Sequence, residues 1–261
     1  MKSALQNHDI VEQYLAKEVS LGRITGPYTS SPLTSLLHTT HFGVIPMHDH
    51  PWKWQLILDL SFPPGSVNDS IDNNDFPLSY SHVDDAIHFI MQEGRGTLLA
   101  NIDIHSAYHL ILIDPHDLHL LGMSWDNQLY VDLALPFSLH STPFIFNQFV
   151  KAWHIWVLHH RHGICYLLHY LDDYLTAGAP NSWECHNNLS SIRSSASSLG
   201  ILLALEKATV LSFLGIKLDT RLFVAHLPTE KLSTLQSLIQ SWSHKIFFFS
   251  KKLLFYLQYE H

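Results

Sequence analysis

The chain has 261 residues, of which 46% are hydrophobic, so it is long enough to bury a substantial core in one large domain or a few subdomains. No apolar run reaches the ~18 residues that a membrane span needs, and the N-terminus carries no apolar signal segment, so we expect an intracellular protein of the cytoplasm or nucleus without membrane contact. The formal net charge is −8, with five arginines against 21 histidines, whereas a nucleic-acid-binding protein usually has a basic surface. Cys165 and Cys185 lack the spacing of a metal or disulfide site, so a reducing compartment is expected.

The spacing of apolar and turn-forming residues predicts short strands alternating with helices, which indicates an α+β fold. The first half is expected to contain a helix within residues 1–21, strands Phe42–Pro46 and Trp54–Leu60, a helix over residues 84–92 and strand Thr97–Ile104. The second half is expected to contain a helix from Ser141 to about His162, a strand hairpin over residues 165–177, a helix over residues 182–198, strands Ile201–Leu205, Phe213–Asp219 and Leu222–His226, and a helix from Pro228 to about Trp242.

Two polar clusters have ordinary structural explanations. Asp84-Asp85 precedes a helical pattern closed by Gly94, so we expect these carboxylates to cap the helix and complement its dipole. Three histidines and an arginine at positions 159–162 could be read as a zinc site. They lack paired ligand spacing, so C-terminal capping of the preceding helix, completed by Gly163, is favoured.

Asp172-Asp173 differs from the earlier pair because it lies between two apolar runs, in the stretch Cys165–Ala177. Each run predicts a buried strand, and the Asp pair predicts the tip of the hairpin between them. Asp is a common turn residue, so the pair alone is weak support for catalysis. Adjacent carboxylates repel each other unless a cation lies on them, and two divalent metal ions there would also stabilise a phosphoryl transfer.

The order of the elements adds a third carboxylate, Asp103, near the end of the strand Thr97–Ile104. In a ferredoxin-like split βαβ arrangement, this strand lies beside the later hairpin. Asp103 would then join Asp172 and Asp173 at one edge of the sheet. Three carboxylates in one place are what two-metal phosphoryl transfer requires.

Nine blocks in this chain, taken in order, resemble the reverse transcriptase domain, most closely that of DIRS/Ngaro-type (tyrosine-recombinase) retrotransposons. They cover roughly residues 22–242 and comprise Gly22–Pro27, Phe42–Pro46, Lys53–Ser61, Gly65–Ile71, Ile102–Tyr108, Leu135–Pro143, Leu168–Asp173, Glu206-Lys207 and Phe213–Asp219. The resemblance implies a right-hand polymerase fold with a ferredoxin-like palm, whose antiparallel sheet carries helices on one face. The implied divisions are an N-terminal extension (residues 1–30), fingers (31–85 and 114–137), a palm (86–113 and 138–227) and the start of a truncated thumb (228–261).

The resemblance also implies roles for individual residues in an RNA-directed DNA polymerase. Asp103, Asp172 and Asp173 would be catalytic and would hold two Mg²⁺ ions, with Mn²⁺ as an alternative, together with the triphosphate of an incoming dNTP. Tyr108 would be a steric gate against the ribose 2′-hydroxyl, and Phe137 would support the nascent base pair. Lys53, Gln55 and Lys207 would complete the nucleotide site, and Phe213, Leu214 and Gly215 would form the primer grip on an RNA or DNA template with its primer.

Several cations of the family are replaced in this chain. Met47-His48 and Gln55 stand where the family has a lysine and an arginine that contact the triphosphate, and Ser138–His140 replaces Gly-Leu-Arg. Each lost arginine–phosphate hydrogen bond costs about 1.5–3 kcal/mol. Two alternatives to an active polymerase therefore stay open: a degenerate copy whose CGN arginine codons have decayed to His and Gln codons, and a non-catalytic scaffold that kept only the fold.

Overall fold

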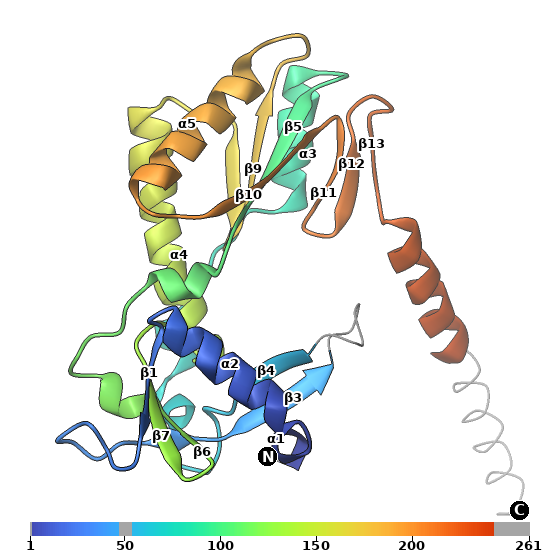
Figure 1. Ribbon diagram of the computed structural model, residues 1–261. Coiled ribbons are helices and arrows are strands. Elements are labelled where there is room, and N and C mark those ends of the chain that lie inside the picture. Colours follow the sequence, from blue (N-terminus) through green and yellow to red (C-terminus); the bar gives the residue numbers. More distant parts are fainter. Residues whose placement is uncertain (1, 47–53, 243–261) are drawn as a thin grey trace, which may run out of the picture.

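A four-stranded antiparallel sheet of order β10-β5-β9-β8 forms the upper part of the computed structural model, which describes residues 2–46 and 54–242 (Figure 1). Its strands are β5 (Leu98–Ile104), β8 (Leu167–Tyr170), β9 (Asp173–Gly178) and β10 (Leu203–Ala208). Strand β5 pairs with both β9 and β10, so the strand that precedes the hairpin in sequence lies beside it in space. The predicted α+β fold and the split βαβ order are therefore both observed.

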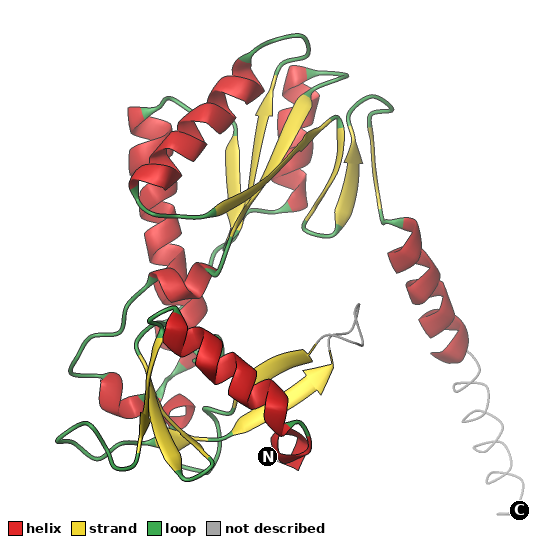
Figure 2. Cartoon of the chain, in the orientation of Figure 1, coloured by secondary structure: helices red, strands yellow, loops and turns green. Residues whose placement is uncertain are grey.

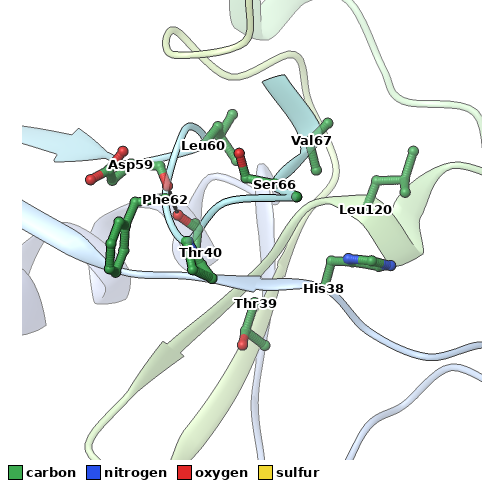
Figure 3. Close-up of a pocket in the computed structure, with 11 residues that line it drawn as sticks. His38, Thr39, Thr40, Asp59, Leu60, Phe62, Ser66, Val67 and Leu120 are labelled. Carbon is green, nitrogen blue, oxygen red and sulfur yellow. Dashed lines mark hydrogen bonds between the residues drawn. The ribbon is translucent and has the colours of Figure 1, made fainter. Parts of the chain in front are cut away.

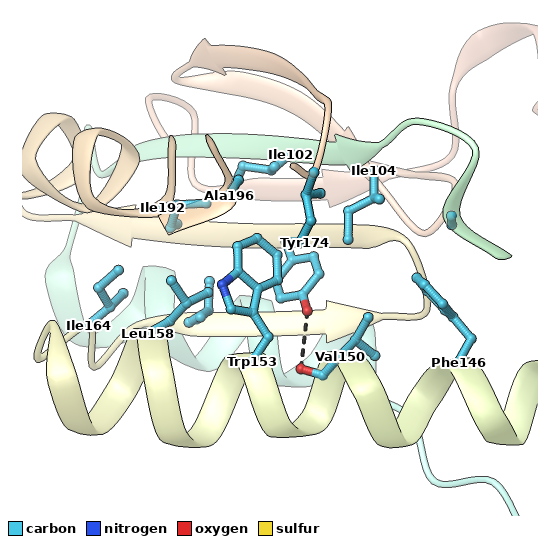
Figure 4. Packing of buried hydrophobic residues seen from close by; sticks show 13 residues of the cluster. Ile102, Ile104, Phe146, Val150, Trp153, Leu158, Ile164, Tyr174, Ile192 and Ala196 are labelled. Carbon is cyan, nitrogen blue, oxygen red and sulfur yellow. Dashed lines mark hydrogen bonds between the residues drawn. The ribbon is translucent and has the colours of Figure 1, made fainter. Parts of the chain in front are cut away.

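Two helical segments cover one face of this sheet. The first is α4 (Thr142–Ala152) with its π-helical continuation η5 (Trp153–Arg161), and the second is α5 (Glu184–Ser198). Because side chains alternate along a strand, Ile102 and Ile104 of β5 point to this face, where Figure 4 shows them with Trp153 and Tyr174 between sheet and helix. Burying each large side chain of this core contributes about 1.5–3 kcal/mol.

The opposite face of the sheet is covered over part of its length by α3 (Val83–Glu93) and by a second sheet. That sheet has the order β11-β12-β13, from β11 (Val210–Phe213), β12 (Ile216–Asp219) and β13 (Val224–His226). Leu99 and Leu175 of the first sheet share a buried cluster with Ile90 of α3 and Phe213 of β11. Asp103 lies on this same face by strand alternation, beyond the covered part, and stays half-exposed.

A separate core holds the lower part of the molecule together (Figure 1). It contains two helices, α1 (Lys2–Gln6) and α2 (His8–Ser20), and the hairpin of β3 (Phe42–Pro46) and β4 (Trp54–Leu58). It also contains a four-stranded sheet of order β1-β7-β6-β2, whose strands are β1 (Ile24–Tyr28), β2 (Thr39–Thr40), β6 (Gly122–Trp125) and β7 (Gln128–Asp132). Val11 and Leu15 of α2 pack against Phe42 and Trp125. The helices at the N-terminus are thus part of this core.

Short helical turns and connections complete the fold, as Figure 2 shows by element type. The 3₁₀ turns are η1 (Val67–Ser70), η2 (Asn73–Asp75), η3 (Ala107–Leu110) and η4 (Leu118–Leu120), and a final helix runs over residues 229–242. At the start of α3, the Asp85 carboxylate accepts a hydrogen bond from the His82 amide at 2.7 Å, so the predicted capping role is confirmed. Among the described residues, no helix combines the length and apolar character that crossing a membrane demands.

One predicted element is wrong: Phe213–Asp219 is not a single strand. Leu214 and Gly215 have φ values of 48° and 78° and form a turn, with Phe213 paired to Ile216 across it. Positive φ at both central positions is the pattern of a type I′ hairpin turn. The apolar character of the whole stretch hid the turn, because Leu214 is not a residue that usually adopts a left-handed conformation. Strand β10 also begins later than predicted, at Leu203.

Candidate active site

The Asp172-Asp173 pair lies where the turn between β8 and β9 leads into β9. Tyr170 and Asp173 close the hairpin as cross-strand partners, which leaves Leu171 and Asp172 as the loop. Leu171 has a φ of 53°, and positive φ at the first loop position alone is the pattern of a type II′ turn. A left-handed conformation costs a non-glycine residue about 1–2 kcal/mol. Such strain at an acidic turn is common at functional sites.

Asp103 is the direct cross-strand partner of Asp173 on β5. The next residue, Ile104, donates its amide hydrogen to the Asp172 carbonyl at 3.1 Å, so β5 holds the turn itself. Directly opposed residues of an antiparallel pair share one face, with Cβ atoms about 4.5–5.5 Å apart. The three carboxylates predicted to meet are therefore brought together by strand pairing.

The electrostatics of these carboxylates favour a bound cation. Burial, together with the charges of Asp172 and Asp103, raises the pKa of the Asp173 carboxyl to about 6. Burial also raises the pKa of Asp172, and the Asp103 charge adds to this effect. Among the described residues, His105 Nδ1 lies 3.8 Å from the Asp103 carboxylate, and this imidazole is charged only when protonated. Clustered carboxylate oxygens are suited to hard divalent ions such as Mg²⁺.

The three aspartates do not form a compact set of metal ligands. Among the described residues, a set of three potential ligands whose ligand atoms all lie within 4.8 Å of one another occurs only at His8, Asp9 and Glu12. The aspartates are therefore more widely spaced than that set.

Tyr108 and Phe137 form an aromatic wall beside the carboxylates. The Tyr108 ring lies 4.8 Å from the Phe137 ring and 5.3 Å from the buried Phe146 ring. Burial and then the Asp172 charge raise the pKa of Tyr108 to about 12, so its hydroxyl lies within electrostatic range of the Asp172 carboxylate. Phe137 is 63% exposed, so its ring is available to a bound molecule.

Sequence reasoning missed Asn68, which holds the loop that follows Phe137. Its side-chain amide donates to the Ser138 carbonyl at 2.8 Å, and its Oδ1 accepts from the His140 amide at 2.9 Å. The same amide also donates to Ser61 at 3.0 Å. Asn68 lies in the block Gly65–Ile71, so its segment was recognised in the sequence. Its hydrogen-bond partners were not, because a single asparagine in a polar loop gives no indication of distant partners.

Comparison with known proteins identifies the family and the fold of this chain. Residues 58–250 match the family model described as reverse transcriptase (RNA-dependent DNA polymerase). The chain belongs to the reverse transcriptase family. No curated protein matches it in sequence.

Solved structures of foamy viral protease-reverse transcriptase share the fold. The form called dRH, in complex with double-stranded DNA, has a TM-score of 0.64 at 17% identity over 87% of this chain and 36% of that chain. The complex with an RNA/DNA hybrid also has a TM-score of 0.64 at 17% identity, over 88% and 28% of the two chains. The native prototype foamy virus enzyme has a TM-score of 0.56 at 18% identity, over 82% and 25%. This reverse transcriptase domain thus spans about a quarter to just over a third of those chains.

The pairing of β10 takes Lys207 away from the three aspartates. Lys207 lies opposite Ala100 of β5, on the face that α5 covers. In agreement, its charge opposes the burial that raises the pKa of the Cys185 thiol on α5 to about 11. Asp103 points to the other face by strand alternation. The structure therefore does not bring Lys207 together with the carboxylates.

The other predicted site residues of the reverse transcriptase lie farther from the aspartates or outside the described part. Gln55 is exposed on β4 opposite Ile45, whereas Lys53 and Met47-His48 fall outside the described residues. Phe213 is buried at the base of the β11–β12 turn, and a Cβ atom on Gly215 would collide with the Lys231 ammonium. The segment predicted to be the primer grip is therefore a hairpin turn that the final helix approaches.

Two cavities in the described part of this reverse transcriptase domain lie apart from the carboxylates. Figure 3 shows one of about 110 Å³, lined by His38, Thr39 and Thr40 with the loop that follows β4. Next to it, a larger cavity of about 460 Å³ lies between that loop and residues 111–121. The aspartates instead are partly exposed on the sheet, beyond the part that α3 and the second sheet cover.

Proposed function

We propose that this domain catalyses RNA-directed DNA synthesis, as the polymerase module of a DIRS/Ngaro-type retrotransposon. The observation that carries the proposal is the direct pairing of Asp103 with Asp173, beside a strained turn that holds Asp172. The chain would provide fingers from residues 31–85 and 114–137 and a palm from residues 86–113 and 138–227. An N-terminal extension (1–30) and the start of a thumb (228–261) would complete it. Template, primer and dNTP would meet on the open face of the palm sheet.

The three carboxylates would hold two Mg²⁺ ions, with Mn²⁺ as a substitute, since oxygen ligands suit both. Bound there, the ions would lower the cost of the primer 3′-oxyanion and stabilise the departing pyrophosphate. Tyr108 would close the site against a ribose 2′-hydroxyl, and Phe137 would contact the nascent base pair. The turn of Leu214 and Gly215, with Phe213 at its base, would position the primer end.

Primer extension on poly(rA)/oligo(dT) tests the proposal directly. The wild-type domain should extend the primer in the presence of Mg²⁺, and Asp172→Asn should abolish the extension, because it removes one charged ligand. Asp84→Asn, at the start of α3, is the matched control and should extend normally. Extension that does not depend on Asp172, or no extension at all, would refute the assignment of polymerase activity.

A degenerate module is the second candidate, supported by the missing cations. Gln55 replaces an arginine, and Ser138 and His140 replace a glycine and an arginine of the family, so the triphosphate would lose charge-assisted hydrogen bonds. Such a module would still bind a primer–template duplex, more weakly as salt rises. A plain scaffold would show no salt-dependent binding. Fluorescence anisotropy of a labelled duplex across a salt series separates these two cases.

A further inference from the structure

Two histidines meet directly behind the acidic turn. His154 is the second residue of the π-helical segment η5, and His169 lies on β8, immediately before Tyr170. Their Nδ1 atoms are 2.7 Å apart, and their rings cross at 81° with centroids 4.9 Å apart. The pair therefore links the helix on the covered face to the strand that leads into Leu171 and Asp172.

A contact through the same nitrogen of both rings requires two different tautomers. One imidazole must carry its proton on Nδ1 and donate, while the other must have a bare Nδ1 that accepts. Burial lowers the pKa of both rings to about 4; repulsion from His159 adds to this for His154, and repulsion from His154 and then Lys151 adds to it for His169. Both rings are therefore neutral near pH 7, and a single shared proton satisfies the pair.

The pair belongs to a series of polar contacts that fix the hairpin on α4 and η5. Tyr174, the residue after Asp173 and the cross-strand partner of His169, donates its hydroxyl to the Val150 carbonyl at 3.2 Å (Figure 4). The His169 amide donates to the Ser81 hydroxyl at 3.4 Å. The His154 contact joins two side chains, so either partner can be altered without removing a backbone bond.

We propose that His154 and His169 are a positioning pair, which holds the Asp172-Asp173 turn in register with Asp103. This role rests on the proposed polymerase function, because a precise register matters only if the three carboxylates act together. π-Helical turns are rare and occur frequently at functional sites, which fits a segment that presents His154 to the hairpin. A long helix that only packed against the sheet would need no such irregularity.

Amide hydrogen exchange at Ile104 tests the proposal without any need for activity. This amide donates to the Asp172 carbonyl, so its protection reports whether the turn stays on β5. His154→Phe keeps an aromatic ring but removes the hydrogen bond, and should lower Ile104 protection about tenfold. His154→Asn places an amide near the former Nδ1 and should restore most of it. The Thr220 amide, which donates to the Thr209 carbonyl in another sheet, should be unaffected by either change.

The double variant His154→Phe/His169→Phe separates loss of positioning from a folding defect. Removing both partners leaves no unpaired buried nitrogen, so this variant should remain folded. It should still expose Ile104 to faster exchange. Unchanged Ile104 protection in all variants, or an equal loss at Ile104 and Thr220, would overturn the positioning role. Mn²⁺ binding, measured by titration of the wild type and of Asp172→Asn as control, tests the polymerase site separately from the positioning role. If the wild type shows no Asp172-dependent binding, the polymerase site fails, while the exchange data still decide whether the pair positions the turn.

Discussion

Asn68 and His140 are joined across 72 positions of the sequence by a hydrogen bond of 2.9 Å from the His140 amide to the Asn68 side-chain oxygen. With the bond from the Asn68 amide to the Ser138 carbonyl, it fixes both ends of the short loop that follows Phe137. Asn68 itself is 3% exposed, so its polar atoms have no ready replacement in water. The position of the Phe137 ring therefore depends on a residue of another segment.

Asn68→Ala is expected to destabilise the domain by about 1–3 kcal/mol, because it leaves the part-buried Ser138 carbonyl and His140 amide without these partners. Urea unfolding followed by circular dichroism measures this change. Asn74→Ala, at an exposed position, is the control and should stay within about 0.5 kcal/mol of the wild type. Equal stability of the two variants would show that the loop finds other partners.

Tyr108→Val is expected to weaken discrimination against ribonucleotides, because the ring that would face the 2′-hydroxyl is removed. The ratio of kcat/KM for dTTP over UTP on poly(rA)/oligo(dT) should fall by at least about tenfold. Tyr108→Phe keeps the ring and should preserve the ratio. If both variants discriminate as the wild type does, Tyr108 is only a core residue.

Stability should fall as pH rises because of Asp132. Burial, with a contribution from the Glu18 charge, raises the pKa of this carboxyl to about 8, against about 3.9 in an unfolded chain. Between these values the folded state binds more protons than the unfolded state, so raising the pH through this window destabilises the fold. Asp132→Asn should remove that loss and raise Tm relative to the wild type more at pH 9 than at pH 5. Asp126→Asn, exposed on the same β-hairpin, should show no such pH dependence.

Mg²⁺ is expected to raise Tm at pH 8 and to have less effect at pH 5. Protons compete with metal for the Asp173 carboxyl, whose pKa burial raises to about 6. At pH 8 this carboxyl is ionised and can bind a cation, whereas at pH 5 it is mostly protonated. Differential scanning fluorimetry with and without Mg²⁺ checks this at both values. Asp173→Asn should abolish the shift, and a shift of equal size in that variant would place the ion elsewhere.

Local patterns were sufficient for the elements around the acidic turn, but they predicted no strand of the sheet β1-β7-β6-β2. Turn residues between two apolar runs predict the β8–β9 hairpin, and an apolar strand ending near Asp103 predicts β5, because side-chain alternation and turn chemistry act within a few residues. The single strand expected at Phe213–Asp219 failed for the same reason. Leu214 is apolar, so its turn had no local signal.

What no local pattern could decide is which distant groups share a face. A shift of one residue in strand pairing moves a side chain to the other face of a sheet. The register of β10 on β5 therefore turns Lys207 toward α5, whereas the register of β9 on β5 sets Asp173 directly opposite Asp103. The amino-acid sequence alone supplied the carboxylates and the turn that holds two of them. Strand register, which depends on packing across the whole sheet, decided that the three aspartates meet and that the lysine does not join them.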